Sequence, residues 1–156
     1  MPFPSSDVSG IFLYFYNENN GFMNKNQLID YLQKQLGTKV AVLKSNTETL
    51  TEARNNEEKS TVGDKYETGR AMVQMELEKS QAQLVQTENM KTALSKIDPN
   101  KKFTTVEFGS AVKTNQGNYF FSIAYGKVEI ENEAVFCLSP VSPIGKTLAG
   151  KKPEKK

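Results

Sequence analysis

The strongest pattern in the chain begins after residue 23, where apolar residues recur at steps of three and four. These steps average near 3.5 residues, which is typical of a coiled-coil seam rather than of a strand. Asn24 or Asn26 can cap the helix, and Gly37 inside it costs about 1 kcal/mol relative to alanine. The pattern predicts one helix to about Asn55, with these seam positions: Ile29, Leu32, Leu36, Val40, Leu43, Thr47 and Leu50.

A second helical run starts near Asp64 and ends at Asp98-Pro99, because proline disfavours helix for the residue before it. Between the two runs, residues 55–63 are polar and have the chemistry of a turn. The second run carries apolar residues on one face, at Val73, Leu77, Leu84, Met90, Leu94 and Ile97, with Met72, Met75 and Ala82 beside it.

Two helices of about 30 residues with a short connection between them are expected to pack as an antiparallel hairpin, each spanning about 45 Å. A chain this polar does not hold such helices singly, so they must share the seam. An intermolecular coiled coil is the competing arrangement.

After Pro99 the apolar period changes to two, which indicates strands. Residues 111–114 and 119–124 read as two strands around a tight turn at residues 115–118. Residues 134–138 form a fully apolar run, as expected of a central strand, and Cys137 within it is expected to be packed core. Ser142 as cap, Pro143 at the first helical position and Gly150 beyond the end predict a short helix over residues 143–149.

The first 22 residues differ in character from the rest of the chain. Residues 11–16 are an unbroken apolar run, too short for a membrane span, which needs about 20 apolar residues. No lysine or arginine precedes the run, so it does not resemble a signal peptide. A short strand is one interpretation; the other, which we prefer, is that Met23 is the true start and residues 1–22 are a non-native or disordered leader.

Net charge and composition argue against several classes of function. The net charge of +2 argues against a binder of nucleic acid over its whole surface, and the single cysteine fits a reducing, cytoplasmic compartment. The chain has no histidine, which removes the commonest general base and most zinc sites. The sequence therefore predicts an α+β protein that is not an enzyme by itself: a helical hairpin over residues 23–98, a small β-rich domain over residues 101–150, and a basic tail over residues 151–156.

Three motifs in this order resemble the bacterial Gre-family transcript cleavage factors. Gly63-Asp64-Lys65-Tyr66-Glu67 at the bend is similar to the Gly-Asp-x-x-Glu tip of that family. Phe108-Gly109-Ser110-Ala111-Val112 is similar to its Phe-Gly-x-x-Val approach to a first strand. Near the end, Ser142-Pro143-Ile144 and Gly150-Lys151 resemble its Ser-Pro-Ile and Gly-Lys segment. The resemblance covers residues 23–151 and implies an FKBP-like fold for the second domain.

The resemblance implies a function for the acidic pair. Asp64 and Glu67 would help to hold a second Mg²⁺, shared with RNA polymerase, when the hairpin enters the polymerase's secondary channel and backtracked RNA is cut at its 3′ end. Mg²⁺ prefers oxygen ligands and uses one or two protein carboxylates. The chain would then be a monomeric accessory factor with no cofactor of its own and no membrane partner. The competing interpretation is a capping box, in which Asp64 caps the second helix and Glu67 bonds back to it.

Other tip and stalk residues are RNA-contact candidates. Tyr66 could stack on a base, although an exposed aromatic residue is an equal interpretation. Lys34, Lys39 and Lys44 could form a basic stripe that guides RNA, although such charges are usually a solvated face.

Two departures from the family keep other functions open. Thr68-Gly69-Arg70 follows Glu67 where the family has Asn-Ala-Glu-Tyr, so a channel binder that inhibits without cleavage remains an alternative. Family members also continue with a further pair of strands after Gly-Lys, so we expect a shortened second domain here. A coiled-coil adaptor unrelated to transcription is the third alternative.

Overall fold

The computed structural model describes residues 13–15, 24–58 and 63–152. Within these ranges, it does not describe the side chains of residues 13, 14, 57, 58 and 63–68. The protein is α+β and divides into two compact units: Leu32–Thr92 is one, and Met1–Tyr31 together with Ala93–Lys156 is the other.

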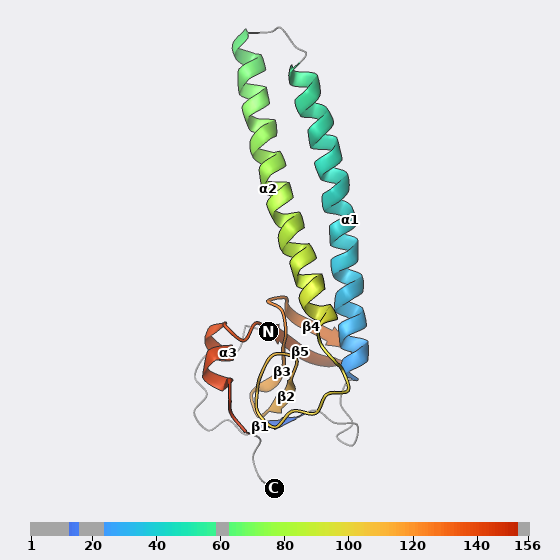
Figure 1. The fold of residues 1–156 in the computed structure, drawn as a ribbon, viewed down its shortest axis with the longest axis vertical. Helices are drawn as coiled ribbons and strands as arrows, with labels where there is room; N and C mark the ends of the chain where they lie inside the picture. Colours follow the sequence, from blue (N-terminus) through green and yellow to red (C-terminus); the bar gives the residue numbers. More distant parts are fainter. Residues whose placement is uncertain (1–12, 16–23, 59–62, 153–156) are drawn as a thin grey trace. The chain divides into compact units, whose positions relative to one another are not determined.

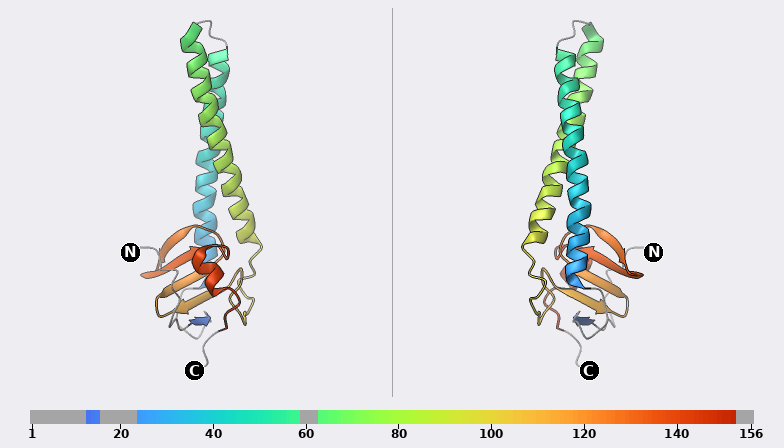
Figure 2. Two further views of the ribbon diagram at one scale, coloured as in Figure 1. Left: turned by 90° about the vertical axis from the view of Figure 1, so that its left-hand side faces the viewer. Right: turned by 90° about the vertical axis from the view of Figure 1, so that its right-hand side faces the viewer.

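The first of these units is built from two long helices, α1 (Lys25–Glu58) and α2 (Gly63–Ser95). They run side by side in Figure 1, and one passes in front of the other in the turned views of Figure 2. Gln33 Nε2 donates to the carbonyl oxygen of Lys91 (3.1 Å), and Thr47 Oγ1 lies 3.2 Å from Ser80 Oγ. Early residues of α1 therefore meet late residues of α2, and the predicted antiparallel hairpin is confirmed.

The helix boundaries differ slightly from the prediction. Asn24 caps α1, since its Oδ1 accepts from the backbone N–H of Asn26 (2.8 Å). The helix continues to Glu58 instead of ending at Asn55, and α2 already begins at Gly63. Loss of the apolar pattern does not end a helix whose backbone hydrogen bonds are satisfied, so the polar residues 55–58 remain helical.

The seam of the hairpin is less apolar than predicted. On α1 it buries Leu32, Leu36, Val40 and Leu43 as expected. On α2, Leu77 and Leu94 are buried as expected and Val73, Leu84 and Met90 are half-buried. The seam also takes Ser80 and Thr87, which are only 7% and 1% exposed. Because the seam takes Ser80 and Thr87, the apolar side chains of Met72 and Met75 fall outside it and are 63% and 69% exposed.

The second unit contains a five-stranded mixed sheet with strand order β1-β2-β3-β5-β4. The strands are β1 (Leu13–Phe15), β2 (Ala111–Thr114), β3 (Gly117–Phe121), β4 (Gly126–Ile130) and β5 (Glu133–Leu138). All neighbours pair antiparallel except β3 and β5, which are parallel. The strand β5 has a neighbour on each side, so the apolar run predicted as a central strand is confirmed.

Two details of the sheet differ from the prediction. The turn between β2 and β3 is tighter than residues 115–118, because Thr114 pairs directly with Gly117. Thr114 Oγ1 donates to the carbonyl oxygen of Gly117 (2.8 Å) and accepts from the N–H of Gln116 (3.0 Å), which closes the turn after two residues. At its other end β3 stops at Phe121 rather than at residue 124.

Of the first 22 residues, the structure describes Leu13–Phe15, which pair with β2 as the edge strand β1. Phe15 packs against the core of the sheet. The strand interpretation therefore holds for these three residues. The prediction of a leader over residues 1–22 otherwise lies outside the described residues.

The core of the sheet unit lies between α3 (Pro143–Leu148) and the sheet. Side chains from β2, β3 and β5 share a single cluster with one residue of the segment before β2 and two side chains of α3: Val106, Val112, Tyr119, Phe121, Phe136, Leu138, Ile144 and Leu148. Phe120 and Cys137, which alternate with these residues along their strands, are also buried. Both faces of β3 and β5 are thus covered, which explains their continuous apolar sequences.

The predicted short helix is confirmed, with its cap. Ser142 is the N-cap of α3, its Oγ accepts from the N–H of Gly145 (3.1 Å), and Pro143 occupies the first turn. Gly150, just beyond the helix, has a φ of +79°, a conformation that favours glycine. Its N–H donates to the carbonyl oxygen of Val106 (2.8 Å), which ties the end of α3 to the segment before β2.

Candidate functional site

The acidic pair lies at the loop end of the hairpin. Asp64 and Glu67 belong to the first two turns of α2, which begins at Gly63, and the connection at residues 59–62 lies outside the described part of the chain. Neither residue lies midway along a helix. Positions three residues apart share one face of a helix.

The capping interpretation of the pair stays a prediction. The helix α2 begins at Gly63, so Asp64 lies in its first turn, close to the position that a capping box requires. Carboxylates in a first turn remain favourable there, because they lie at the positive end of the helix dipole. The side chains of Asp64, Tyr66 and Glu67 lie outside the described part of the structure, so their contacts stay a prediction.

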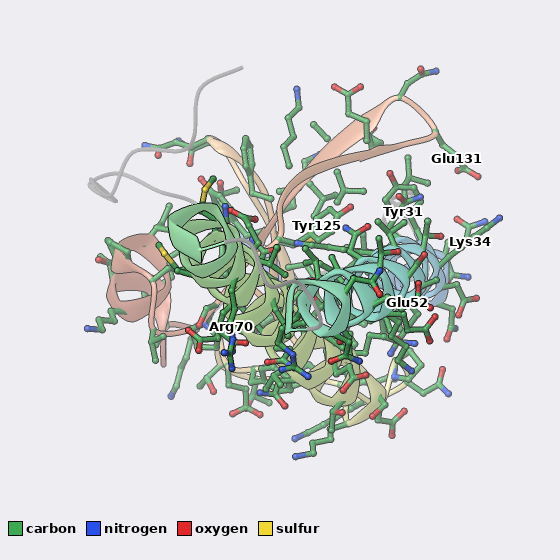
Figure 3. The ribbon with its side chains drawn as sticks, turned by 90° about the horizontal axis from the view of Figure 1, so that it is seen from above. Tyr31, Lys34, Glu52, Arg70, Tyr125 and Glu131 are labelled. Carbon is green, nitrogen blue, oxygen red and sulfur yellow. The ribbon has the colours of Figure 1, made fainter. Side chains whose placement is uncertain are left out.

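The three lysines proposed as RNA contacts do not form one stripe. Lys34, Lys39 and Lys44 are separated by steps of five residues, and each step turns about 140° around the helix axis. Lys44 Nζ lies 3.9 Å from Glu88 Oε1 of α2, an exposed ion pair. Lys34 and Glu52, by contrast, are exposed on the side of α1 that faces away from α2 (Figure 3). The charges of α1 thus point in several directions.

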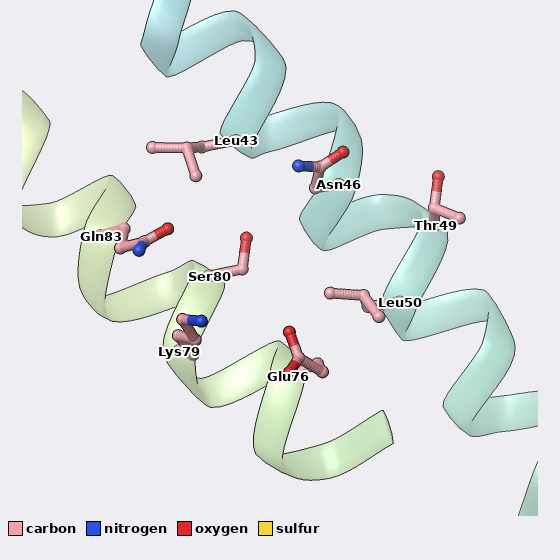
Figure 4. A pocket seen from close by; sticks show the side chains of 8 residues that line it. All are labelled: Leu43, Asn46, Thr49, Leu50, Glu76, Lys79, Ser80 and Gln83. Atoms are coloured by element: carbon pink, nitrogen blue, oxygen red, sulfur yellow. The ribbon is translucent and has the colours of Figure 1, made fainter. Parts of the chain in front are cut away.

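A shallow groove lies between the helices in the middle of the hairpin (Figure 4). Its volume is about 340 Å³, and it is lined by Leu43, Asn46, Thr49, Leu50, Glu76, Lys79, Ser80 and Gln83. Ser80, one of the lining residues, lies with its Oγ 3.2 Å from Thr47 Oγ1 at this level of the seam. Its lining mixes amides, hydroxyls and one charge of each sign, which is the composition of a solvated surface rather than of a catalytic centre.

Reactive groups outside the acidic pair are few in the described residues. Cys137 is buried in β5, and desolvation raises the pKa of its thiol to about 12, so it is an inert core residue. The described ranges contain no group of three or more acidic, histidine or cysteine side chains that could hold a metal.

The sequence patterns did not predict one polar cluster in the sheet unit. Lys25 Nζ donates to the carbonyl oxygen of Gly109 (2.8 Å) and lies 4.8 Å from the centre of the Phe103 ring. Desolvation lowers the pKa of Lys25 to about 8, while the Asp98 carboxylate opposes that shift. A lysine at the first position of α1 is unfavourable beside the positive end of the dipole, and this was the available signal that it needs another partner.

The glycine of the second motif has a structural reason. Gly109 has a φ of +93°, and an added Cβ would lie 3.2 Å from Cζ of Phe103. Its N–H donates to the carbonyl oxygen of Phe121, so this residue leads the chain into β2 alongside β3. The residues that carry the resemblance here therefore build the sheet unit.

Comparison with protein-family models, with curated proteins and with solved structures finds no match to this chain. None of the helices in the described ranges has the length and apolar character that crossing a membrane requires.

Proposed function

We propose that this chain binds RNA polymerase through its helical hairpin and stimulates the polymerase's own cleavage of backtracked RNA. The observation that carries the proposal is the position of Asp64 and Glu67 in the first turns of α2, directly after the hairpin connection. An FKBP-like identity of the sheet unit, a cytoplasmic location and a monomeric state belong to the same proposal. They rest on the resemblance in the motifs at residues 63–67, 108–112 and 142–151.

The donor set suits the metal that this function requires. Two carboxylates on one helical face match the preference of Mg²⁺ for one or two protein carboxylates with several retained waters. When bound, such an ion lowers the pKa of its water and supplies a nucleophile for attack on a phosphodiester. Asp64 and Glu67 would contribute oxygen ligands, and the polymerase would supply the rest.

The hairpin's part in this function is to present the pair at a fixed geometry. From Leu32 to Glu58, α1 rises about 40 Å, and α2 runs back along it. The seam, which buries Leu32, Leu36 and Leu43 on α1 and Leu77 on α2, holds the two helices together. A helical support fixes the backbone at the pair more closely than a free loop would.

A second candidate function is inhibition of the polymerase without cleavage. The observation that favours it is the segment Thr68-Gly69-Arg70, which departs from the family's tip immediately after Glu67. Gly69 is half-buried inside α2 and costs about 1 kcal/mol of helix stability relative to alanine. The helix is therefore weakest next to the acidic pair.

The test uses stalled elongation complexes in which the RNA has backtracked. Wild-type protein should accelerate RNA cleavage. Asp64→Asn or Glu67→Gln should reduce that acceleration by about 100-fold or more while binding persists, because a bound metal ion contributes several kcal/mol to the transition state. Glu76→Gln, an exposed carboxylate on the same helix, is the matched control and should behave as wild type. Binding without any cleavage by the wild type would favour the inhibitor. Absence of binding would refute both functions and leave the coiled-coil adaptor.

A further inference from the structure

An exposed apolar patch lies on α2 close to the acidic pair. It consists of Ala71, Met72 and Met75, and its two methionines are 63% and 69% exposed. Single exposed apolar residues are common and need no explanation. Here, however, two large ones are three residues apart and therefore adjoin on one face of the helix.

The position of the patch decides what can cover it. The helix α2 is continuous from Gly63 to Ser95, so the distance along its axis follows from the residue count. Met72 lies about 12 Å and Met75 about 16 Å from Asp64 along that axis. If a partner receives Asp64 and Glu67 in an interior site as proposed, the next turns of α2, which carry Met72 and Met75, are the following part of the hairpin to meet it.

We propose that Ala71, Met72 and Met75 are an anchoring surface that binds an apolar wall of the same partner that receives the acidic pair. The inference rests on the proposed function and assigns separate roles to the two sets of residues. The methionines contribute affinity for the partner, and the carboxylates contribute ligands for the Mg²⁺ ion. Methionine suits this role because its unbranched, polarizable side chain adapts to an irregular apolar surface.

The neighbouring seam does not need these side chains. Among the described side chains of α2, the buried ones are Leu77, Ser80, Thr87 and Leu94, whereas both methionines are exposed to solvent. Replacing Met72 and Met75 by glutamine keeps side-chain length and helix propensity nearly unchanged. The double variant Met72→Gln/Met75→Gln should therefore fold as wild type, which circular dichroism checks.

The experiment compares this double variant with Val85→Gln in the full chain. Val85 is 57% exposed on the same helix but lies about 31 Å from Asp64, beyond both methionines. The readouts are the Kd for stalled elongation complexes and the cleavage rate at saturating protein. We expect the double variant to raise the Kd by about 100-fold, roughly tenfold for each methionine, without changing the saturated rate. Val85→Gln should leave both values at wild type.

Several results would overturn the inference. An unchanged Kd for the double variant, with wild type binding and cleaving, would refute the anchoring surface and leave the proposed function intact. An equal loss in Val85→Gln would show that the effect is not local. A wild-type dimer that the double variant converts to monomer, measured by analytical ultracentrifugation, would assign the patch to a second copy of the chain. A wild type that does not bind polymerase would refute the proposed function, and this inference with it.

Discussion

Replacing Gly145 by alanine should strongly destabilise the sheet unit. Gly145 is buried in the first turn of α3, and its N–H donates to Ser142 Oγ, which in turn donates to the carbonyl oxygen of Ser139 (2.7 Å). An added Cβ would overlap that carbonyl oxygen and lie 2.8 Å from Ser142 Oγ and 2.9 Å from the carbonyl carbon of Pro140. Two of these three atoms belong to the backbone, so rotating a side chain cannot relieve the overlap.

The magnitude depends on the atoms that must move. Shifting the turn at residues 139–142 removes the Ser142 cap, which is worth about 1 kcal/mol. Overpacking at a buried site adds about 1–3 kcal/mol. We therefore expect Gly145→Ala to lower the free energy of unfolding of the sheet unit by about 3 kcal/mol.

Cys137 offers a probe that reports on the sheet unit alone. It is 1% exposed in β5, so a thiol reagent reaches it only when that unit opens. A loss of about 3 kcal/mol should raise the labelling rate about 100-fold when opening and closing are fast relative to labelling. Gly150→Ala is the control, since its Cβ would meet nothing within 4 Å and would pay only about 1–2 kcal/mol for the positive φ. Labelling of Gly145→Ala at the wild-type rate would refute the steric argument.

Two further predictions concern the hairpin and the thiol. Gly37→Ala should stabilise the hairpin by about 1 kcal/mol, because alanine has the higher helix propensity and its Cβ would make only an ordinary 3.7 Å contact with Lys91 Nζ. Thermal melting followed by circular dichroism measures this, and an unchanged or lower Tm would contradict it. The pKa of Cys137 is raised to about 12, so folding keeps the thiol protonated, and this stabilisation is complete below pH 9 and lost as the pH rises towards 12. Between pH 9 and 11, urea titrations should show wild type losing about 1 kcal/mol per pH unit more than Cys137→Ala, and parallel losses would show that the thiol titrates alike in both states.

Much of the fold was predictable where local signals agree with packing. The heptad steps from Leu32 to Leu43, the cap at Ser142 and the apolar run around Cys137 each predicted the correct element. In all three, the local preference and the buried position require the same residue type.

The strand β4 was missed because its sequence carries little pattern. Gly126–Ile130 buries only Val128, and charged residues flank it. A two-residue turn joins β4 to β5, and both of its residues, Glu131 and Asn132, adopt positive φ. Asparagine is common in such turns but glutamate is not, so the sequence of the turn did not indicate a hairpin.

The candidate site, like the fold, was predicted only in part from the sequence. The position of Asp64 and Glu67 at the end of the hairpin followed from the break in periodicity between two helices. The exposure of Met72 and Met75 did not, because the apolar pattern alone suggested that they border the seam. Which face of a nearly uniform helix is buried depends on the partner helix, and α2 buries Ser80 and Thr87 in preference to methionine.

The sheet unit is interrupted in sequence by the whole hairpin, since it joins residues up to Tyr31 with those from Ala93 onward. The hairpin is therefore an insertion whose length can be changed by excising seven residues from each helix at facing levels, such as those of Thr47 and Ser80. Each such excision would shorten it by about 10 Å and return every remaining seam residue to its facing neighbour. A series of these shortened proteins could be used to measure the depth of a cavity that receives the hairpin.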